Sequence, residues 1–151
     1  MTGETACVEI RRRLAAPPAR VFKAFADARL LPRWLTPSPD ITLTLLAFDF
    51  REGGAYRFAY GLPDGQTVIV GGHYQRIEPP RRIVFSWIIE PPDEHAGLES
   101  EVTVSLDQDG DGTALVIRHE KLTRGGAVAR HHEGWVGALD QLSAMLAPAA
   151  G

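Results

Sequence analysis

Two histidines and two tyrosines are the side chains in this sequence that are best placed to do chemistry. His119 alternates with apolar residues that mark the core face of a predicted strand, and His132 falls in the apolar stripe of the last predicted helix. We expect the two rings to face each other across the interior, with Tyr56 and Tyr74 nearby on the sheet. Because histidine titrates near neutral pH, such a pair can hydrogen-bond a ligand carbonyl or hydroxyl, or transfer a proton.

The same histidines also have a purely structural interpretation. Buried polar groups are normally hydrogen-bonded, so a histidine pair can lie in a core with backbone or tyrosine partners. We place this structural role first, ligand orientation second and acid–base catalysis third. The protein is therefore expected to be a binding protein rather than an enzyme, and no catalytic residue is assigned.

A set of large apolar side chains could either line a pocket or fill a core. The set consists of Trp34, Phe58, Phe85, Trp87, Trp135 and, on the last helix, Leu139. Ligand pockets are mostly apolar with a few polar groups, whereas most protein interiors are close-packed. Gly134 lets a strand or a ligand approach the helix, although a glycine inside a helix costs about 1 kcal/mol. The geometry of the predicted sheet favours the pocket.

Metal and cofactor motifs are not supported by the residue spacing. The segment 107–112 opens like a calcium loop, but the twelfth position is Arg118, where a glutamate is needed, so we predict a hairpin turn. His131 and His132 resemble a metal pair, yet adjacent helical residues point about 100° apart. The sequence also has no nucleophile elbow and no phosphate-binding glycine loop. We expect no metal and no cofactor.

Seven segments alternate apolar and polar residues with a period of two, and they predict strands. They cover residues 7–14, 41–50, 55–60, 67–78, 82–89, 99–106 and 113–120. Short turns join the last six of these segments, and no helical pattern lies between them. Parallel strands would need helical crossovers, so the order indicates an antiparallel meander.

Two short helices are predicted after the first strand, and one long helix near the end of the chain. Pro17 and Pro18 end the first strand and suit the first turn of a helix. Asp27 is a suitable N-cap for a second short helix that carries Trp34. In residues 127–146, apolar side chains recur at steps of four and three, the period of an amphipathic helix. This stripe consists of Val128, His132, Trp135, Leu139, Leu142 and Leu146.

The predicted elements constrain the shape of the interior. One helix is about 10 Å wide, whereas seven strands about 4.8 Å apart span more than roughly 30 Å. A sheet with one apolar face must be covered, so we expect it to curl around the single long helix. At the open end of the sheet, near the two short helices, side chains of the sheet then fail to meet side chains of the elements opposite, and the fold favours an internal cleft.

Composition limits the class of protein and its partners. A chain of 151 residues suits one domain, here 1–151 with its core at 8–147. The net charge of −3 argues against nucleic acid or an anionic membrane as a partner. Cys7 is the only cysteine, so no intramolecular disulfide or cysteine-rich zinc site can form. No signal peptide and no stretch of about 20 apolar residues is visible, so we expect a cytoplasmic protein without membrane insertion.

Several sequence motifs resemble those of a known family, in the same order along the chain. They are DFREGGAYRF (49–58), GHYQRIEPPRRIVFSW (72–87), HEKL (119–122), HEGW (132–135) and LDQL (139–142). The chain is similar, over residues 8–147, to the heat-shock-protein-90 ATPase activator homologue group of the START-like, or SRPBCC, superfamily. It departs from the usual pair of tryptophans, because Trp34 is followed by Leu35.

This resemblance implies a helix-grip fold, which is an α+β fold with a curved antiparallel sheet of six to seven strands around a long C-terminal helix. It also implies a deep hydrophobic cavity between sheet and helix. Members of the superfamily bind lipids, sterols, polyketides or hormones, and some are cyclases or hydrolases.

Three functions are compatible with this sequence. The first is binding of a small hydrophobic molecule that is lipid-like, polyketide-like or aromatic. The second is a cyclase or hydrolase that acts through His119, His132 and a tyrosine. The third is a co-chaperone-like interaction module, as the family name suggests. A filled core would remove the first two functions, and a homodimer through an exposed sheet edge is compatible with each of them.

Overall fold

The computed structural model describes residues 6–147, and its elements follow the predicted order. The strands are β1 (Val8–Leu14), β2 (Thr42–Phe48), β3 (Ala55–Gly61), β4 (Thr67–Glu78), β5 (Arg82–Ile89), β6 (Glu99–Asp109) and β7 (Gly112–Glu120). The helices are α1 (Pro18–Ala26), the 3₁₀ turn η1 (Leu31–Arg33) and α2 (Ala127–Leu146). Of the helices in this part of the chain, none is long and apolar enough to span a bilayer.

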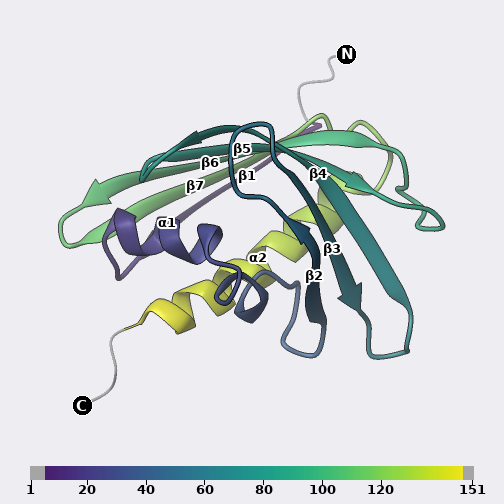
Figure 1. Cartoon of the computed structure of the whole chain (residues 1–151), viewed down its shortest axis with the longest axis horizontal. Coiled ribbons are helices and arrows are strands. Elements are labelled where there is room, and N and C mark those ends of the chain that lie inside the picture. The colour runs from purple at the N-terminus through teal and green to yellow at the C-terminus, as the bar shows by residue number, and fades with distance from the viewer. Residues whose placement is uncertain (1–5, 148–151) are drawn as a thin grey trace.

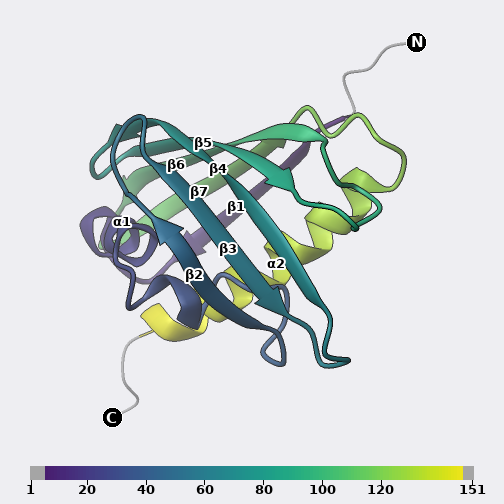
Figure 2. The same ribbon diagram turned by 45° about the vertical axis from the view of Figure 1, so that its right-hand side comes forward.

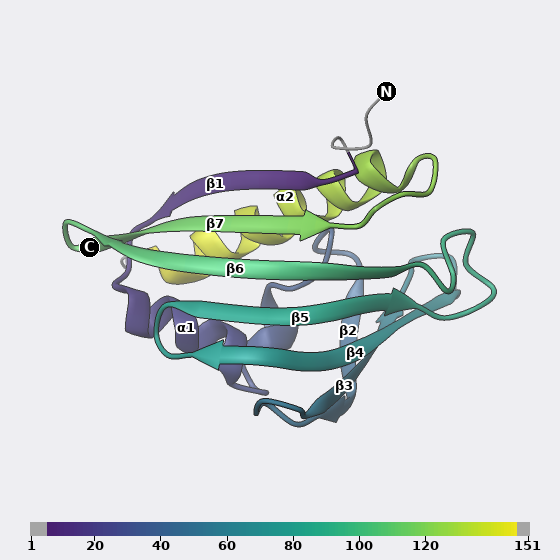
Figure 3. The same cartoon turned by 90° about the horizontal axis from the view of Figure 1, so that it is seen from above.

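The strands form one seven-stranded sheet in the order β1-β7-β6-β5-β4-β3-β2 (Figure 3). Every neighbouring pair is antiparallel, and from β2 to β7 each strand pairs with the next one along the chain. The first strand returns to the far edge and pairs with the last, so that Val8 lies opposite His119. The predicted antiparallel meander is therefore confirmed.

The sheet curves around α2, which lies on its concave side (Figures 1 and 2). Strands β2, β3 and β4 bend down past the middle of the helix, whereas β1 runs beside it and packs on it. Helix α1 fills the same side at one end, against β6 and β7, and η1 packs on β2. This arrangement is the helix-grip fold that the sequence predicts.

The second short helix is smaller than the spacing suggested. It is a single 3₁₀ turn, and Asp27 does not cap it. Asp27 instead ends α1, where its N–H donates to the carbonyl of Lys23 and its carboxylate accepts the N–H of Arg29 at 2.8 Å. Pro32, which has no N–H to donate, lies within the turn and limits its extension.

The buried face of α2 differs from the predicted stripe in its first two turns. The buried residues are Ala127, His131, Trp135, Ala138, Leu139, Leu142 and Leu146. Val128 is only half-buried and His132 is exposed, so the predicted inward position of His132 is wrong. His131 and His132 lie four and three residues before Trp135, so either one fits the spacing of the buried face of an amphipathic helix. The sequence pattern alone could not show which of the two is buried. The small Ala127 and the ring of His131 occupy the sheet side instead.

Candidate functional site

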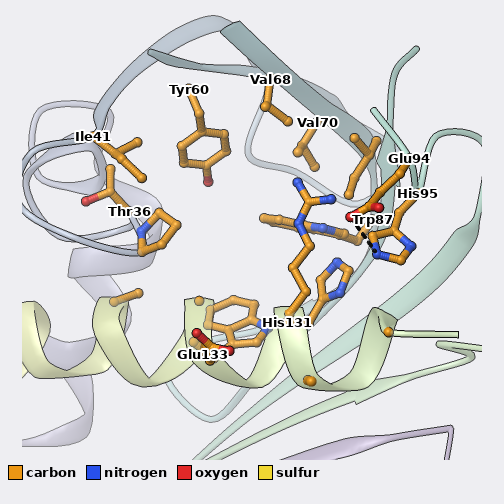
Figure 4. Close-up of a pocket in the computed structure, with 18 of the residues that line it drawn as sticks. Thr36, Ile41, Tyr60, Val68, Val70, Trp87, Glu94, His95, His131 and Glu133 are labelled. Atoms are coloured by element: carbon orange, nitrogen blue, oxygen red, sulfur yellow. Dashed lines mark ion pairs between the residues drawn. The ribbon is translucent and has the colours of Figure 1, made fainter. Parts of the chain in front are cut away.

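A cavity of about 690 Å³ lies between α2 and the strands β3, β4 and β5 (Figure 4). Volumes of roughly 300–1,000 Å³ are typical of small-molecule sites. The strands contribute a largely apolar roof, with Tyr60 from β3, Val68 and Val70 from β4, and Trp87 and Ile89 from β5. Alternate residues of a strand point to the same face, which is why these side chains converge on one space.

Helix α2 provides the floor of the cavity through Gly134, Trp135 and Ala138. A methyl group added at Gly134 would meet no atom within 4 Å, whereas one added at Gly137 would collide with the carbonyl of Pro37. Gly137 is therefore needed for close packing of the helix on a loop. The space over Gly134 is open instead. No strand therefore approaches the helix closely at Gly134, which was one of the two alternatives that we predicted.

The loop between η1 and β2 closes one end of the cavity, where Thr36 and Ile41 line it (Figure 4). The side chain of Gln141 on α2 donates hydrogen bonds to the carbonyl and the hydroxyl of Thr36, at 2.8 and 2.9 Å. These bonds tie the loop to α2 at this end of the cavity.

The loop between β5 and β6 closes the other end and is polar. Arg130 on α2 donates to both carboxylate oxygens of Asp93, at 2.6 and 2.7 Å, and these hydrogen bonds lower the pKa of Asp93. The backbone N–H of His95 donates to the same carboxylate at 2.8 Å. Arg124 donates to the carbonyls of Glu94 and Ala96. The first turn of α2 and the residues before it therefore hold this loop over the cavity.

His119 lies fully buried behind the cavity wall, with both ring nitrogens occupied. The indole N–H of Trp135 donates to its Nδ1 at 3.1 Å, so the proton of the neutral ring is on Nε2, which donates to the Ser100 hydroxyl at 2.7 Å. Ser100 in turn donates to the carbonyl of Trp87 at 2.8 Å. Burial, with a smaller effect from His131, lowers the pKa of His119 to about 3. The ring is neutral at physiological pH and fixes the two tryptophans of the wall.

His131 projects from α2 into the cavity (Figure 4). Its Nδ1 donates to the carbonyl of Ala127 at 2.7 Å, which leaves Nε2 as an acceptor in the neutral ring. Burial lowers the pKa of His131 and favours this neutral form. Its ring centroid lies 4.8 Å from that of His119 and 6.4 Å from that of His95. Nevertheless, within residues 6–147 no group of three or more His, Cys, Asp or Glu side chains could hold a metal ion.

The structure brings only part of the predicted site together. Trp87 and Trp135 line the cavity. His119 lies behind these two tryptophans, and Leu139 is buried in the core. His132 is exposed and does not line the cavity; it borders a more open groove that adjoins the cavity at Gly126 and Glu133.

The other predicted residues are buried outside the cavity, four of them in one aromatic cluster and Trp34 against α1. Tyr56 contacts Phe58, Tyr74 and Phe85 with ring centroids 4.6, 5.4 and 5.8 Å apart, and its hydroxyl donates to the carbonyl of Ser86 at 2.6 Å. Trp34 is buried against Phe25 and donates to a backbone carbonyl of α1. None of these predicted residues lines the cavity.

Sequence reasoning missed the polar residues of the cavity. Tyr60 shares its strand phase with Tyr56 and Phe58, so its inward position could have been found from the alternation. His131 could have been found only by testing the neighbouring helical stripe. Asp93 and His95 lie in a loop without periodicity, and no local signal places them against Arg130.

Comparisons with known proteins agree with this architecture. The family profile of the activator of Hsp90 ATPase homolog 1-like proteins matches residues 15–147. The crystal structure of protein CV1439 from Chromobacterium violaceum is similar, with 30% identity and a TM-score of 0.86, covering 95% of this chain and 99% of that one. A comparison with curated proteins gave no match.

Two further crystal structures are similar along most of the chain. CalU16 from Micromonospora echinospora is 31% identical with a TM-score of 0.69, covering 97% of this chain and 82% of that one. The AHSA1 protein SPO3351 from Silicibacter pomeroyi is 25% identical with a TM-score of 0.82, covering 93% and 96%. The seven-stranded sheet, the long helix that it grips and these matches together show that the chain belongs to the activator of Hsp90 ATPase homolog 1-like family.

Proposed function

We propose that this protein binds a small, largely apolar ligand in the cavity between α2 and strands β3 to β5. The observation that carries this proposal is the space itself, about 690 Å³ with walls formed mainly by Tyr60, Val68, Val70, Trp87 and Trp135. Burial of apolar surface drives binding, and such walls offer a ligand that surface without rearrangement of the sheet.

The cavity carries a cost that a ligand would offset. The apolar side chains that line this half-open cavity face water, whereas a filled core would give them packing contacts. Gly134 adds a further cost of about 1 kcal/mol, since glycine is a poor helix former. No packing contact within the described residues requires a glycine there, because the space over it is open. Gly134 thus lowers the stability of the helix and leaves space free beside it. This combination supports a role of the cavity in binding a ligand.

The hydrogen-bonding of the histidines supports binding over turnover. A cyclase or hydrolase of the expected kind needs a histidine that can exchange protons with a ligand. His119 has both ring nitrogens engaged and a pKa of about 3, while His132 points away from the cavity. Of these three histidines, His131 alone lines the cavity, and its Nδ1 is bound to the backbone.

A protein-interaction role has less support from the surface. Large exposed apolar patches usually mark docking sites. Over residues 6–147 the large hydrophobic side chain that is exposed is Leu46, at 48%. The ligand-binding function is therefore the better supported of the three.

Native mass spectrometry of the purified full-length protein tests this proposal. We expect a co-purifying small molecule, and we expect it to be lost in Gly134→Leu, because the leucine side chain extends into the open space. Gly134→Ala is the matched control, since it gives the same improvement in helix propensity with little filling. A ligand retained equally by both variants would place binding elsewhere. Failure of the wild type to retain a small molecule, or to take up an added polycyclic hydrocarbon, would contradict the proposal.

A further inference from the structure

His131 is a titratable side chain in the cavity wall that the proposed function leaves without a role. It lines the cavity and is 8% exposed. Figure 4 shows its ring directed from α2 into the space. His131 precedes Trp135 by one helical turn, so the two side chains are neighbours on the same face of α2. A guest molecule that lies over Trp135 therefore also contacts the ring of His131.

The backbone fixes the proton of the neutral His131 ring on one nitrogen. A carbonyl oxygen can only accept, so the 2.7 Å contact between Nδ1 and the carbonyl of Ala127 places the proton on Nδ1. The fully enclosed side-chain atoms without a partner in residues 6–147 are the Trp87 indole nitrogen and the Nδ1 of His95. The Nε2 of His131 is not one of them, so water can reach it from the cavity. A second proton on this ring therefore binds at Nε2.

The charged groups around His131 do not favour a second proton. Arg130 comes directly before it on α2, and its positive charge opposes another cation. Asp93 in the loop between β5 and β6 attracts a cation, but both of its oxygens accept hydrogen bonds from Arg130, at 2.6 and 2.7 Å. Glu94 and Glu133 also line the cavity, and both are exposed, so water and salt weaken their effect.

Two other histidines face the His131 ring from neighbouring elements. His119 on β7 has its ring centroid 4.8 Å away and stays neutral over most of the acid range, because burial lowers its pKa to about 3. His95 lies 6.4 Å away in the loop, and a charge on it opposes one on His131. Burial has the largest effect on His131 and lowers its pKa, although the bond to Ala127 acts in the opposite direction. His131 is therefore mainly neutral at pH 7 and becomes charged in acid.

A protonated His131 and an apolar guest make opposite demands on the same space. Water in the empty cavity can accept a hydrogen bond from a proton on Nε2, whereas a hydrocarbon cannot. A charged N–H that loses water and gains no acceptor is costly. The guest therefore favours the neutral ring, and by linkage the proton favours the empty cavity to the same extent.

We infer that an apolar ligand and a proton on Nε2 of His131 exclude each other, so that the protein releases its ligand on acidification. This inference rests on the proposed function and adds a mode of regulation to the same site. The ligand binds with full affinity where His131 is neutral. Its affinity falls as the pH decreases through the range in which the empty protein takes up this proton.

Titration of the full-length protein with Nile red, an apolar dye that carries no charge over this range, tests the inference. Fluorescence gives the Kd of the dye at a series of pH values. Coupling to one proton changes Kd by at most about tenfold per pH unit, so we expect binding to weaken by roughly tenfold between about pH 7.5 and pH 4.5. Circular dichroism at each pH shows whether the protein is folded, which separates release of the dye from unfolding.

Single substitutions identify the proton site. His131→Gln keeps a polar side chain that does not titrate, so its Kd should change by less than about twofold over the same range. His132→Gln is the matched control, because this neighbour on α2 is exposed and lies outside the cavity. His95→Gln should also keep the pH dependence, because the Nε2 of His95 lies 3.8 Å from the Glu94 carboxylate, which can balance a charge there.

NMR of the imidazole nitrogens in the wild-type protein gives a readout that does not depend on a variant. The pKa of His131 should be lower with Nile red bound than without it. A histidine that only packs against the cavity wall would titrate alike in both states.

The outcomes separate this inference from the proposed function. A Kd that is constant over the pH range, or a pKa of His131 that the dye does not change, would overturn the coupling and leave the cavity as a binding site. A pH dependence that persists in His131→Gln, or that disappears in His132→Gln or His95→Gln, would also overturn it. Failure of the folded protein to bind Nile red at any pH would instead contradict the proposed function.

Discussion

The interior of this protein has a packed half and a hollow half, and the same strands supply both. Strand β3 delivers Tyr56 and Phe58 to the packed half and Tyr60 to the hollow half. Strand β5 likewise delivers Phe85 to the packed half and Trp87 to the cavity wall. Large inward-facing side chains on the sheet therefore do not determine by themselves whether a region is filled.

The difference lies in the layer opposite the sheet. In the packed half, α1 contributes Phe22, which contacts Phe50, and Phe50 lies 4.9 Å from Tyr74. In the hollow half, α2 lines the cavity with the small residues Gly134 and Ala138 on either side of Trp135, and the space over Gly134 is open. A void persists where small residues face a curved sheet, because the backbone of a regular helix cannot move inward to close it. The comparison shows that small residues on a helix can leave room for a binding site between the helix and a sheet.

Truncation of one tyrosine in each half should produce the largest difference. Tyr74 and Tyr60 are both buried, but Tyr74 contacts four aromatic rings and Tyr60 faces the cavity. Tyr74→Ala should lower the free energy of unfolding by about 3–5 kcal/mol, and Tyr60→Ala by about half as much. Urea unfolding followed by circular dichroism measures both. Equal losses would indicate that the two halves are packed alike.

Acid should destabilise the protein through the histidine behind the hollow half. The pKa of His119 is about 3 in the folded state and 6.5 for an ordinary histidine, so the unfolded chain binds more protons between these values. The contribution of His119 to the free energy of unfolding is at its maximum well above pH 6.5. It decreases as the pH falls, by about 2.5 kcal/mol from pH 6 to pH 4. His119→Gln should flatten the curve of unfolding free energy against pH in that range. A curve of unchanged slope would rule out His119 as its source.

The two glycines of α2 should respond in opposite directions to alanine. Gly137→Ala should destabilise by about 1–3 kcal/mol, because the new methyl group collides with the carbonyl of Pro37. Gly134→Ala should stabilise by about 0.5–1 kcal/mol, because the methyl group enters open space and helix propensity improves. Thermal unfolding of both variants measures the contrast. A destabilised Gly134→Ala would mean that the floor of the cavity is closed.

Removal of a single hydroxyl should give the smallest contrast. The Tyr56 hydroxyl donates to the carbonyl of Ser86 at 2.6 Å, and burial raises the pKa of Tyr56. Tyr56→Phe should therefore cost about 1 kcal/mol, the usual net value of one hydrogen bond. The Tyr60 hydroxyl faces the cavity without a partner among the described residues, so Tyr60→Phe should leave unfolding unchanged within roughly 0.5 kcal/mol. A larger loss at position 60 than at position 56 would reverse the assignment of the two halves.

Much of the architecture could be predicted from local patterns. Strands β4 and β5 and helix α2 have the predicted bounds. Period-two alternation and turn residues act over a few positions, so they can be read without knowledge of distant contacts. The pairing of β1 with β7 was not predicted, because it joins segments about 100 residues apart and no local pattern in β1 indicates its partner. The predicted pocket residues Trp87 and Trp135 line the cavity, whereas the predicted His132 does not.

The amino-acid sequence by itself determined the elements, their order and the presence of more apolar sheet surface than one helix can cover. The sequence predicted that the uncovered space lies near the two short helices, but this position is wrong for α1, which fills the packed half and lines no part of the cavity. Only the tertiary structure decided where the space lies and which polar residues line it. Trp135 reaches His119, and Arg130 reaches Asp93, through contacts between segments that no short-range pattern relates. Whether a region of the interior is filled depends on the side chains that all neighbouring elements place in it. Those elements are distant in the sequence and become neighbours only when the chain folds.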